Sequence, residues 1–323
     1  MDPFFSVIIP VYNRAEPLRQ AIQSVLAQSC PDFEILVVDD GSKDDPRAVA
    51  DSFHDPRIRF MAQPNSGAGK ARNTAIDQAR GRFVAPLDSD DVFLPHHLAS
   101  MKTLLENTAD MVGYARVRVD RGGGRMFLKP PRALRAREDM AAYLLCDRGF
   151  VPTITVVAPR DAALRIRYDE DLWPAQDTDF AIRLSLAGYR FEMLEEPGAV
   201  WRDGYDPSRV SAGIGGSKLG PWLERMRPRI TPRAYHGGRG WAYAKLIAPE
   251  QPFAGLGLYL SAVLRGCYRP PLAAIIFLQI FLSRSGYRRL ADQAISWLSI
   301  GARDGKAAAH KRPTHAGPSP IQR

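Results

Sequence analysis

Short apolar runs alternate with helical patterns along the first half of the chain. The runs at 6–11, 34–38 and 83–87 contain at most one polar residue each, at their start, which is typical of strands buried on both faces of a sheet. Between the first two runs, apolar side chains recur at helical spacing over about 16–28. Further strands are expected at 58–61, 111–119 and 199–202, and further helices at 46–53, after 66–69, at 95–107 and from 177 onward.

This alternation predicts an α/β fold in which a Rossmann-like, mostly parallel central sheet carries helices on both faces. Ligands bind to such sheets outside the carboxyl ends of the strands. Three polar clusters fall at these predicted ends, at 10–13, 39–42 and 88–91. We therefore expect one shared binding site, in which the flat face of Tyr12 stacks on a base and an aspartate of the second cluster accepts a hydrogen bond from a ring N–H.

The third cluster contains Asp88 and Asp90, whose side chains leave the same face of an extended segment. Two like charges this close repel each other unless something positive lies between them. Oxygen ligands favour a hard divalent cation, Mg2+ or Mn2+, which often binds substrate phosphates as well. The alternative is a solvated turn in which Asp90 or Asp91 caps the helix that Pro95 opens.

The other clusters also have simpler interpretations. Residues 39–42 can form an ordinary Asp-Gly turn, and Tyr12 can be an aromatic side chain at the rim without a ligand. The segment 66–73 places Lys70 and Arg72 at the start of a helix, where phosphates bind, or simply leaves both exposed. The segment is not a P-loop, and no G-x-G-x-x-G turn follows the first strand, which counts against a nicotinamide enzyme.

Composition and charge describe a globular chain with two unlike halves. The chain is 45% hydrophobic and 24% charged, and its three widely spaced cysteines form no metal pattern and suggest a reduced, cytoplasmic protein. We find no secretory signal and no run of about 18 apolar residues. Residues 1–215 carry a net charge of −4 and residues 216–323 a net charge of +13. This division favours two regions with different partners.

The basic second half contains two strongly apolar stretches, 255–264 and 272–282, flanked by arginines. Apolar faces edged by arginine and aromatic side chains suit helices that lie in a membrane interface over anionic lipid. Alternatively, these faces pack against the first domain or a partner chain. No nucleic-acid-binding motif is present, so we expect no nucleic acid partner. We expect residues 1–212 to form the main domain, 213–302 a basic helical region and 303–323 a disordered tail.

Five motifs in a fixed order give the chain a family resemblance. They are Ser-Val-Ile-Ile-Pro-Val-Tyr-Asn at 6–13, Ser-Val-Leu-Ala-Gln at 24–28, Val-Val-Asp-Asp-Gly-Ser at 37–42, Gly-Lys-Ala-Arg-Asn at 69–73 and Leu-Asp-Ser-Asp-Asp at 87–91. In this order they resemble family 2 glycosyltransferases with the GT-A fold, over about residues 5–210. The resemblance implies an inverting transferase that takes a sugar from a nucleotide-diphosphate donor, with UDP favoured as the nucleotide.

The resemblance also implies roles for individual residues. Asp88 and Asp90 would be the metal-binding acids, and Arg72 would lie near the phosphates or the base. Asp177 would be the catalytic base, although Gln176 stands where similar enzymes carry a glutamate. The residues expected to bind the nucleotide sugar are Pro10, Val11, Tyr12, Asp39, Asp40, Lys70, Arg72, Asp88 and Ser89.

A base at Asp177 suits the chemistry, because a sugar hydroxyl is a poor nucleophile at neutral pH. A carboxylate that takes the proton as the hydroxyl attacks C1 lowers the barrier, and the transition state should resemble an oxocarbenium ion. Without a catalytic role, Asp177 would cap the following helix. The negative charge of Asp179 would then interact favourably with the positive, N-terminal end of that helix. Asp206 stands where relatives often place a histidine that can bind the metal, so it is a weaker candidate ligand or an ordinary turn residue.

The sequence therefore predicts a metal-dependent glycosyltransferase at the cytoplasmic face of a membrane. Its acceptor would be a glycan or a lipid-linked molecule in polysaccharide, lipopolysaccharide or glycolipid assembly. Two alternatives stay open: a glycosyltransferase with a soluble acceptor, and a nucleotide-sugar-binding module without catalysis. The joint presence of Asp88, Asp90 and Asp177 argues against the second alternative.

Overall fold

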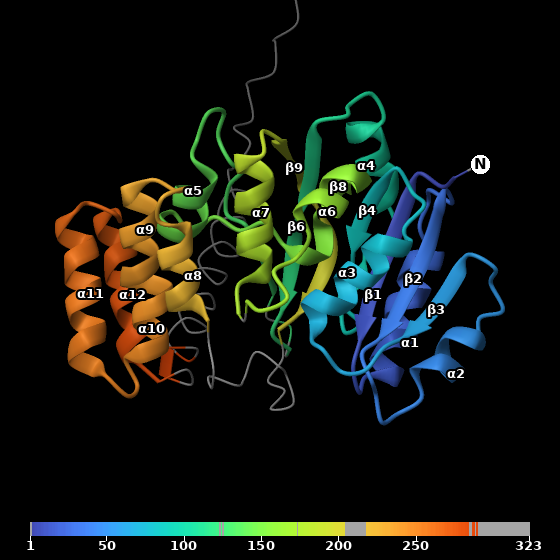
Figure 1. Cartoon of the computed structure of the whole chain (residues 1–323), viewed down its shortest axis with the longest axis horizontal. Helices are drawn as coiled ribbons and strands as arrows, with labels where there is room; N and C mark the ends of the chain where they lie inside the picture. The colour runs from blue at the N-terminus through green and yellow to red at the C-terminus, as the bar shows by residue number, and fades with distance from the viewer. Residues whose placement is uncertain are drawn as a thin grey trace, which may run out of the picture.

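Two sheets with helices packed against them make up the described part of the chain (Figure 1). The computed structural model describes residues 2–122, 124, 126–172, 174–203, 218–283, 286, 287 and 289. The strands are β1 (Phe5–Val11), β2 (Phe33–Asp39), β3 (Ile58–Ala62), β4 (Phe83–Pro86), β5 (Val92–Phe93), β6 (Met111–Asp120), β7 (Met126–Lys129), β8 (Ala158–Pro159) and β9 (Arg190–Arg202). The helices are α1 (Ala15–Leu26), α2 (Pro46–Asp51), α3 (Ala68–Gln78), α4 (His97–Leu105), α5 (Met140–Cys146), α6 (Arg160–Ile166), α7 (Gln176–Leu186), α8 (Leu219–Met226), α9 (Pro232–Gly238), α10 (Ala244–Ile247), α11 (Pro252–Leu264) and α12 (Pro270–Phe281).

The first sheet has the order β3-β2-β1-β4-β8, and its first four strands are parallel. All of β1 is buried, as its apolar sequence predicts. Because side chains alternate along a strand, Ile8 joins the core that contains α3, while Val7 and Ile9 join the core that contains α1. β8 pairs antiparallel with β4 at the edge. The predicted α/β fold with a mostly parallel sheet between helices is confirmed.

A second sheet, in the order β5-β9-β6-β7, was not predicted, because the sequence pattern assigns the strand expected at 111–119 to the single central sheet. β6 and β9 run parallel, with one register shift after Ala115. β5 follows the acidic cluster directly and pairs antiparallel with the end of β9. The backbone N–H of Arg202 then donates to Oδ1 of Asp91 at 2.8 Å. These contacts fasten the acidic loop, residues 88–91, to the end of β9.

Helices α8 to α12 lie beyond α5 and α7 and extend one end of the molecule (Figure 1). Trp222 and Tyr268 are buried in the core that also contains α3, α5 and α7. The indole Nε1 of Trp222 donates to Oδ1 of Asp179, in α7, at 2.8 Å. Part of the basic region therefore packs against the rest of the chain. The predicted domain boundary at 212–213 and the tail 303–323 lie outside the described residues.

Helix α4 carries a buried imidazole that the sequence does not single out. The ring of His97 lies 4.6 Å from that of Phe93, and neither of its nitrogens has a hydrogen-bond partner among the described residues. A Cβ atom at Gly198 would lie 2.2 Å from Nδ1 of His97, so glycine leaves room for the ring. Burial, and to a lesser extent the charge of His96, lowers the pKa of His97 from 6.5 to about 3.

We expect the free energy of unfolding to fall in mild acid because of His97. Below pH 6.5 the unfolded chain binds a proton at this imidazole, and the folded chain does so only near pH 3, so stability decreases as the pH falls between these values. At about pH 5 the loss from this group is ~2 kcal/mol. Urea unfolding near neutral pH and at about pH 5 should show this loss in the unaltered protein and not in His97→Leu. An identical pH dependence of the two proteins would contradict the assignment.

Candidate functional site

The loops that follow β1 and β2 are joined by hydrogen bonds. The backbone N–H of Asn13 donates to Oγ of Ser42 at 2.9 Å, and that of Lys43 donates to Oδ1 of Asn13 at 2.7 Å. Oδ1 of Asp39 accepts the N–H of Ser42 at 2.9 Å, which closes the turn after β2. Tyr12 directly precedes Asn13 and is 39% exposed, so its ring is accessible to a ligand. The first two polar clusters therefore lie together at one edge of the sheet.

The carboxylate of Asp40 is buried and organises the loop that leads into α3. It accepts hydrogen bonds from Nε2 of Gln63 at 2.7 Å and from the backbone N–H groups of Ser66 and Gly67 at 2.9 and 2.8 Å. Asp40 therefore has a structural role, and its contact with a base stays a prediction. The two other predicted residues at this edge are buried within β1: Pro10 and Val11.

Arg72 connects three parts of the site from its position on α3. Its buried guanidinium donates to Oδ1 of Asp88 at 2.6 Å and to Oε1 of Gln176 at 3.3 Å. It also lies over the ring of Tyr168, 5.3 Å from the centroid. Burial lowers the pKa of Arg72, but the negative charge of Asp88 and other acidic neighbours outweighs burial, so the pKa stays above its ordinary value. The alternative in which Arg72 is simply exposed is wrong.

Asp177 lies in the first turn of α7, beside this cluster. Its carboxylate is partly buried, and Oδ1 accepts the N–H of Thr178 at 2.7 Å. Burial raises the pKa of Asp177 and the charge of Asp88 adds to this, while the N–H of Thr178 and the charge of Arg72 oppose it. The structure thus brings together three predicted residues, Arg72, Asp88 and Asp177. The N-cap of α7 is Ala175, so Asp177 is not the capping residue.

The backbone just before Asp177 is strained. Ala175 has a φ of 81° and a ψ of 26°, a left-handed conformation that costs a residue other than glycine about 1–3 kcal/mol. Nε2 of Gln176 donates to the carbonyl oxygen of Asp169 at 3.0 Å. A Cβ atom at Gly69 would lie 2.2 Å from that Nε2, so glycine leaves room for the amide. Gln176 therefore bridges α3 and the segment before α7, and it fixes the start of the helix that carries Asp177.

The sequence does not reveal two further residues of the site. Arg14 pairs with Asp90, so the loop after β1 contacts the acidic loop directly. Tyr168 stacks on Phe180 of α7 with 4.3 Å between ring centroids, and its buried hydroxyl has no hydrogen-bond partner among the described residues. Arg14 could have been suspected because it directly follows the first polar cluster. No sequence pattern marks Tyr168.

The acidic loop is held by its own contacts and does not cap α4. Ser89 and Asp91 are buried, and Asp91 accepts the backbone N–H from the end of β9 described above. The N-cap of α4 is His96, which makes no side-chain capping bond. The alternative in which Asp90 or Asp91 caps this helix is therefore wrong.

The oxygen donors of the acidic loop fit a hard divalent cation. The side chains of Asp88 and Asp90 are 34% and 22% exposed, although each pairs with an arginine. In the described part of the chain, no group of three His, Cys, Asp or Glu is placed to hold a metal ion. Mg2+ is commonly bound by one or two carboxylates and completed by substrate phosphates, which is the set available here. Asp206, the weaker candidate metal ligand, lies outside the described residues. Lys70, predicted to bind the nucleotide sugar, lies at the start of α3 and pairs with Glu170 at 3.4 Å.

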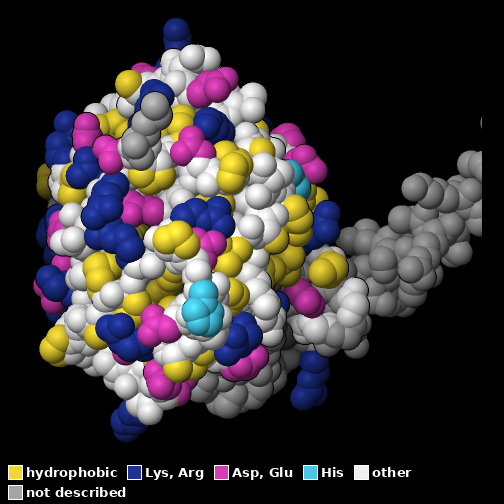
Figure 2. Space-filling view, turned by 90° about the vertical axis from the view of Figure 1, so that its right-hand side faces the viewer, with side chains coloured by type: hydrophobic (Ala, Val, Ile, Leu, Met, Phe, Trp, Pro, Cys, Tyr) yellow, Lys and Arg dark blue, Asp and Glu magenta, His cyan; other side chains and the backbone are white. Residues whose placement is uncertain are grey.

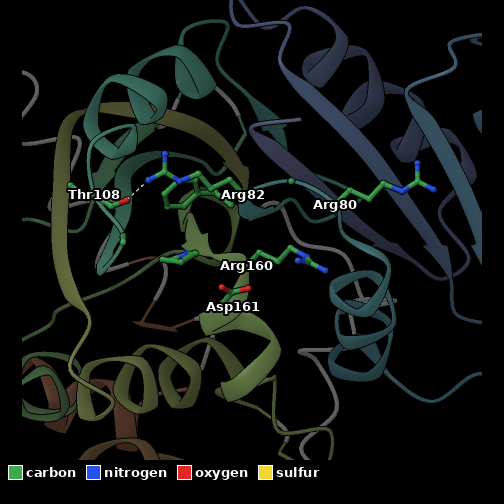
Figure 3. Close-up of a pocket in the computed structure, with 9 residues that line it drawn as sticks. Arg80, Arg82, Thr108, Arg160 and Asp161 are labelled. Carbon is green, nitrogen blue, oxygen red and sulfur yellow. Dashed lines mark hydrogen bonds between the residues drawn. The ribbon is translucent and has the colours of Figure 1, made fainter. Parts of the chain in front are cut away.

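A cavity of about 210 Å³ lies away from these residues, at the amino end of β4 (Figure 3). Two of its arginines are bound to backbone carbonyl groups: Arg82 donates to Glu106 and Thr108 at 2.8 and 2.7 Å, and Arg160 to Ala79 at 2.7 Å. Ligands of parallel sheets bind at the opposite, carboxyl edge. We therefore assign no substrate to this cavity.

Solved structures confirm the class of fold. TarS of S. aureus in complex with UDP-GlcNAc aligns over 93% of this chain and 92% of its own, with a TM-score of 0.59 and 19% identity. The mannosyltransferase PcManGT from Pyrobaculum calidifontis, in complex with GDP-Man and Mn2+, aligns over 92% of this chain and 87% of its own, with a TM-score of 0.57 and 18% identity. At these identities the likeness establishes the fold alone. The described chain has the predicted α/β fold of the GT-A type.

The sequence itself defines the family. The model of Glycosyl transferase family 2 matches residues 6–173, more than half of the chain. The chain therefore belongs to glycosyl transferase family 2, and the predicted resemblance is confirmed. The amylovoran biosynthesis glycosyltransferase AmsB of Erwinia amylovora is 30% identical over 246 residues, which cover 72% of this chain and 80% of AmsB. The family match includes all five motifs and ends just before Gln176 and Asp177.

Proposed function

We propose that the chain is an inverting, metal-dependent glycosyltransferase that acts on a nucleotide-diphosphate sugar. The observation that carries this proposal is the position of Arg72, which joins Asp88 of the acidic loop to Gln176, the neighbour of Asp177. A carboxylate suited to a metal–diphosphate complex and a carboxylate suited to take a proton thus lie in one site. This combination is what sugar transfer from a diphosphate donor requires.

In the proposed reaction Asp177 is the base. Its carboxylate takes the proton of the acceptor hydroxyl while the hydroxyl oxygen attacks C1 of the donor sugar. The bond between C1 and the diphosphate oxygen breaks, and its electron pair leaves with the diphosphate. Attack from the face opposite the leaving group inverts the configuration at C1. The raised pKa of Asp177 makes it a stronger base than an ordinary aspartate, and Arg72 provides a positive charge in a site that binds an anionic donor.

Asp88 and Asp90 would hold Mg2+ or Mn2+ together with phosphate oxygens of the donor. The ion would neutralise negative charge on the departing diphosphate. Both carboxylates pair with arginines, Arg72 and Arg14, so binding of the ion would compete with these pairs. The Mn2+ in the complex of PcManGT, a protein of the same fold, supports the proposal.

We favour a UDP-sugar as donor and a hydroxyl of a glycan or lipid-linked molecule as acceptor. TarS was solved with UDP-GlcNAc and PcManGT with GDP-Man, which supports a nucleotide-diphosphate sugar as the donor. The exposed ring of Tyr12 offers a stacking surface for the base beside Asp39. The name of AmsB refers to amylovoran biosynthesis, which supports a role in assembling polysaccharide or glycolipid.

A hydrolysis screen tests this proposal. The full chain is incubated with UDP-, GDP- and dTDP-sugars in Mg2+, Mn2+ or EDTA, and release of the nucleoside diphosphate is measured. We expect release from one class of donor, and only when metal is present. Binding of a donor without release under any condition would favour a non-catalytic binding module, and the absence of both would refute the proposal.

Helices α11 and α12 lie at the end of the molecule away from the first sheet (Figure 1). Several apolar side chains of these helices are exposed to solvent. Phe253, Leu260 and Leu264 lie on one face of α11 and are 88%, 46% and 86% exposed. Neither helix contains a charged residue, and exposed Arg265 and Arg269 flank the turn between them. At the opposite end, acidic and basic side chains are interspersed over the surface (Figure 2). No helix among the described residues is long and apolar enough to cross a membrane.

We infer that α11 and α12 rest on anionic lipid at the cytoplasmic face of a membrane, so that residues 213–302 attach a catalytic domain of residues 1–212. Replacing Phe253 and Leu264 by serine should lower retention on phosphatidylglycerol vesicles at least tenfold, because buried apolar area contributes about 25 cal/mol per Å². Flotation at low salt measures retention. Leu186→Ser, at an exposed position of α7, should float like the unaltered protein. If the unaltered protein does not float, the proposed contact with the membrane is refuted.

A further inference from the structure

Four cationic side chains from separate parts of the chain converge near the end of the second sheet. This basic cluster consists of Lys129 at the end of β7, Arg121 after β6, Arg148 after α5 and Lys245 in α10. The acidic side chain that acts on Lys129 is Asp203, and it already pairs with Arg121 at 3.3 Å. The described charges that act on Lys129 are therefore three cations and one carboxylate.

Three aromatic rings surround the ammonium group of Lys129. Its Nζ lies 5.0 Å from the ring centroid of Trp201, 5.7 Å from that of Phe150 and 5.9 Å from that of Phe127. Trp201 and Phe127 both stand opposite Val119 in the sheet, which places them on the same face. Phe150 and Trp201 are also in contact, with centroids 5.7 Å apart. A cation and flat apolar surfaces thus occur together, a combination that suits a sugar with an anionic group.

The ammonium of Lys129 makes no ion pair with a carboxylate of the described residues. Burial lowers the pKa of Lys129 to about 8, and the charges of Arg121, Arg148 and Lys245 act in the same direction, while Asp203 opposes them. An anion bound here would place a negative charge beside the ammonium group and its three aromatic rings.

The basic cluster adjoins the acidic loop of the proposed donor site. Trp201 precedes Arg202 on β9, and the N–H of Arg202 donates to Asp91, the residue after Asp90. We propose that the basic cluster binds an oxyanion, a phosphate or a carboxylate, of a sugar-containing acceptor, with Trp201 and Phe150 against the sugar ring. Its assignment to the acceptor rests on the proposed function, because the molecule that receives the sugar must lie beside the donor. The binding of an anionic sugar does not depend on that function.

Tryptophan fluorescence of the full chain tests this subsite, with excess UDP and Mn2+ to fill the donor site. The probes are glucose 1-phosphate, glucuronate and uncharged glucose. We expect at least one anionic probe to change the fluorescence and glucose to have no effect. Lys129→Met should weaken binding of that probe about tenfold, because a charged hydrogen bond is lost. Lys129→Arg should retain binding, and Lys102→Met should not alter it, since Lys102 contacts Phe4 and Asp32 instead.

The response to each probe identifies the anion, phosphate or carboxylate. Trp201→Phe should remove the signal, because this ring lies in the subsite. Equal affinities of Lys129→Met and the unaltered protein, or equal binding of glucose, would overturn the proposal. If Lys129→Met does not fold, Arg148→Gln replaces it, because Arg148 is exposed. This variant should also bind the anionic probe more weakly, and an unchanged affinity would overturn the proposal. Failure to bind UDP in a separate titration would count against the proposed donor and not against the anion subsite.

Discussion

Asp177→Asn should lower the release of UDP from the donor sugar about a thousandfold and leave the affinity for UDP unchanged, because a general base contributes at the chemical step. The substitution keeps the shape of the side chain and removes the group that takes the proton. Initial rates with Mn2+ and a UDP titration measure the two quantities separately. Release at the normal rate by Asp177→Asn would show that another group is the base.

The control for this experiment is Asp171→Asn. Asp171 is an exposed aspartate just before α7 that pairs with Lys218 at 2.6 Å, so its substitution should leave the rate unchanged.

The dependence of activity on pH gives a second test of Asp177 as the base. A base acts only when deprotonated, and burial raises the pKa of Asp177. Activity should therefore decline, as the pH falls, at a higher pH than an ordinary aspartate would give, and this acid limb should be missing from the residual activity of Asp177→Asn.

Asp88→Asn should abolish the effect of Mn2+ on the affinity for UDP. In the unaltered protein we expect Mn2+ to strengthen UDP binding about 100-fold relative to EDTA, because a metal ion contributes several kcal/mol at a diphosphate. The variant should bind UDP with the same low affinity in both conditions. Calorimetric titration measures this difference. Arg72 loses a charged partner, so the free energy of unfolding should also fall by about 1–3 kcal/mol, and thermal unfolding must show that the variant is folded during the titration.

Asp110→Asn is the matched control for Asp88→Asn. Asp110 also pairs with an arginine, Arg190, at 3.0 Å, but both are exposed and lie at the amino ends of β6 and β9. Breaking this pair should leave the effect of Mn2+ intact. A full Mn2+ effect in Asp88→Asn would mean that the ion is held by other residues.

The first sheet could be predicted because β1, β2 and β4 are buried almost throughout, which makes their sequences continuously apolar. The second sheet could not. β5 has only two residues, and β7 alternates between exposed and partly buried positions. Such short or half-exposed strands show little hydrophobic pattern in their sequences. Their pairing is decided by contacts between distant parts of the chain.

The candidate site could be predicted in outline, because parallel strands bring their carboxyl ends to one edge. The contacts within the site could not be predicted, because Arg72 contacts residues that are distant in the sequence. Asp88 is 16 residues away along the chain and Gln176 is 104 residues away. A cation near glycines at a helix start suggests an exposed side chain. Here contacts of the guanidinium with Asp88, Gln176 and Tyr168 bury it instead. In the basic region Trp222 is buried against the rest of the chain while Phe253 stands in solvent, and contact with a membrane stays a prediction.

The helix that carries the proposed base is also one of the places where the last part of the chain is attached. Trp222 donates to Asp179 of this helix, and Arg225 pairs with Asp169 of the segment before it. Exchanging the C-terminal helices between related enzymes would therefore change the position of Asp177. Removing these helices would remove contacts that hold α7 in place. A change made in the C-terminal helices is therefore expected to alter turnover as well.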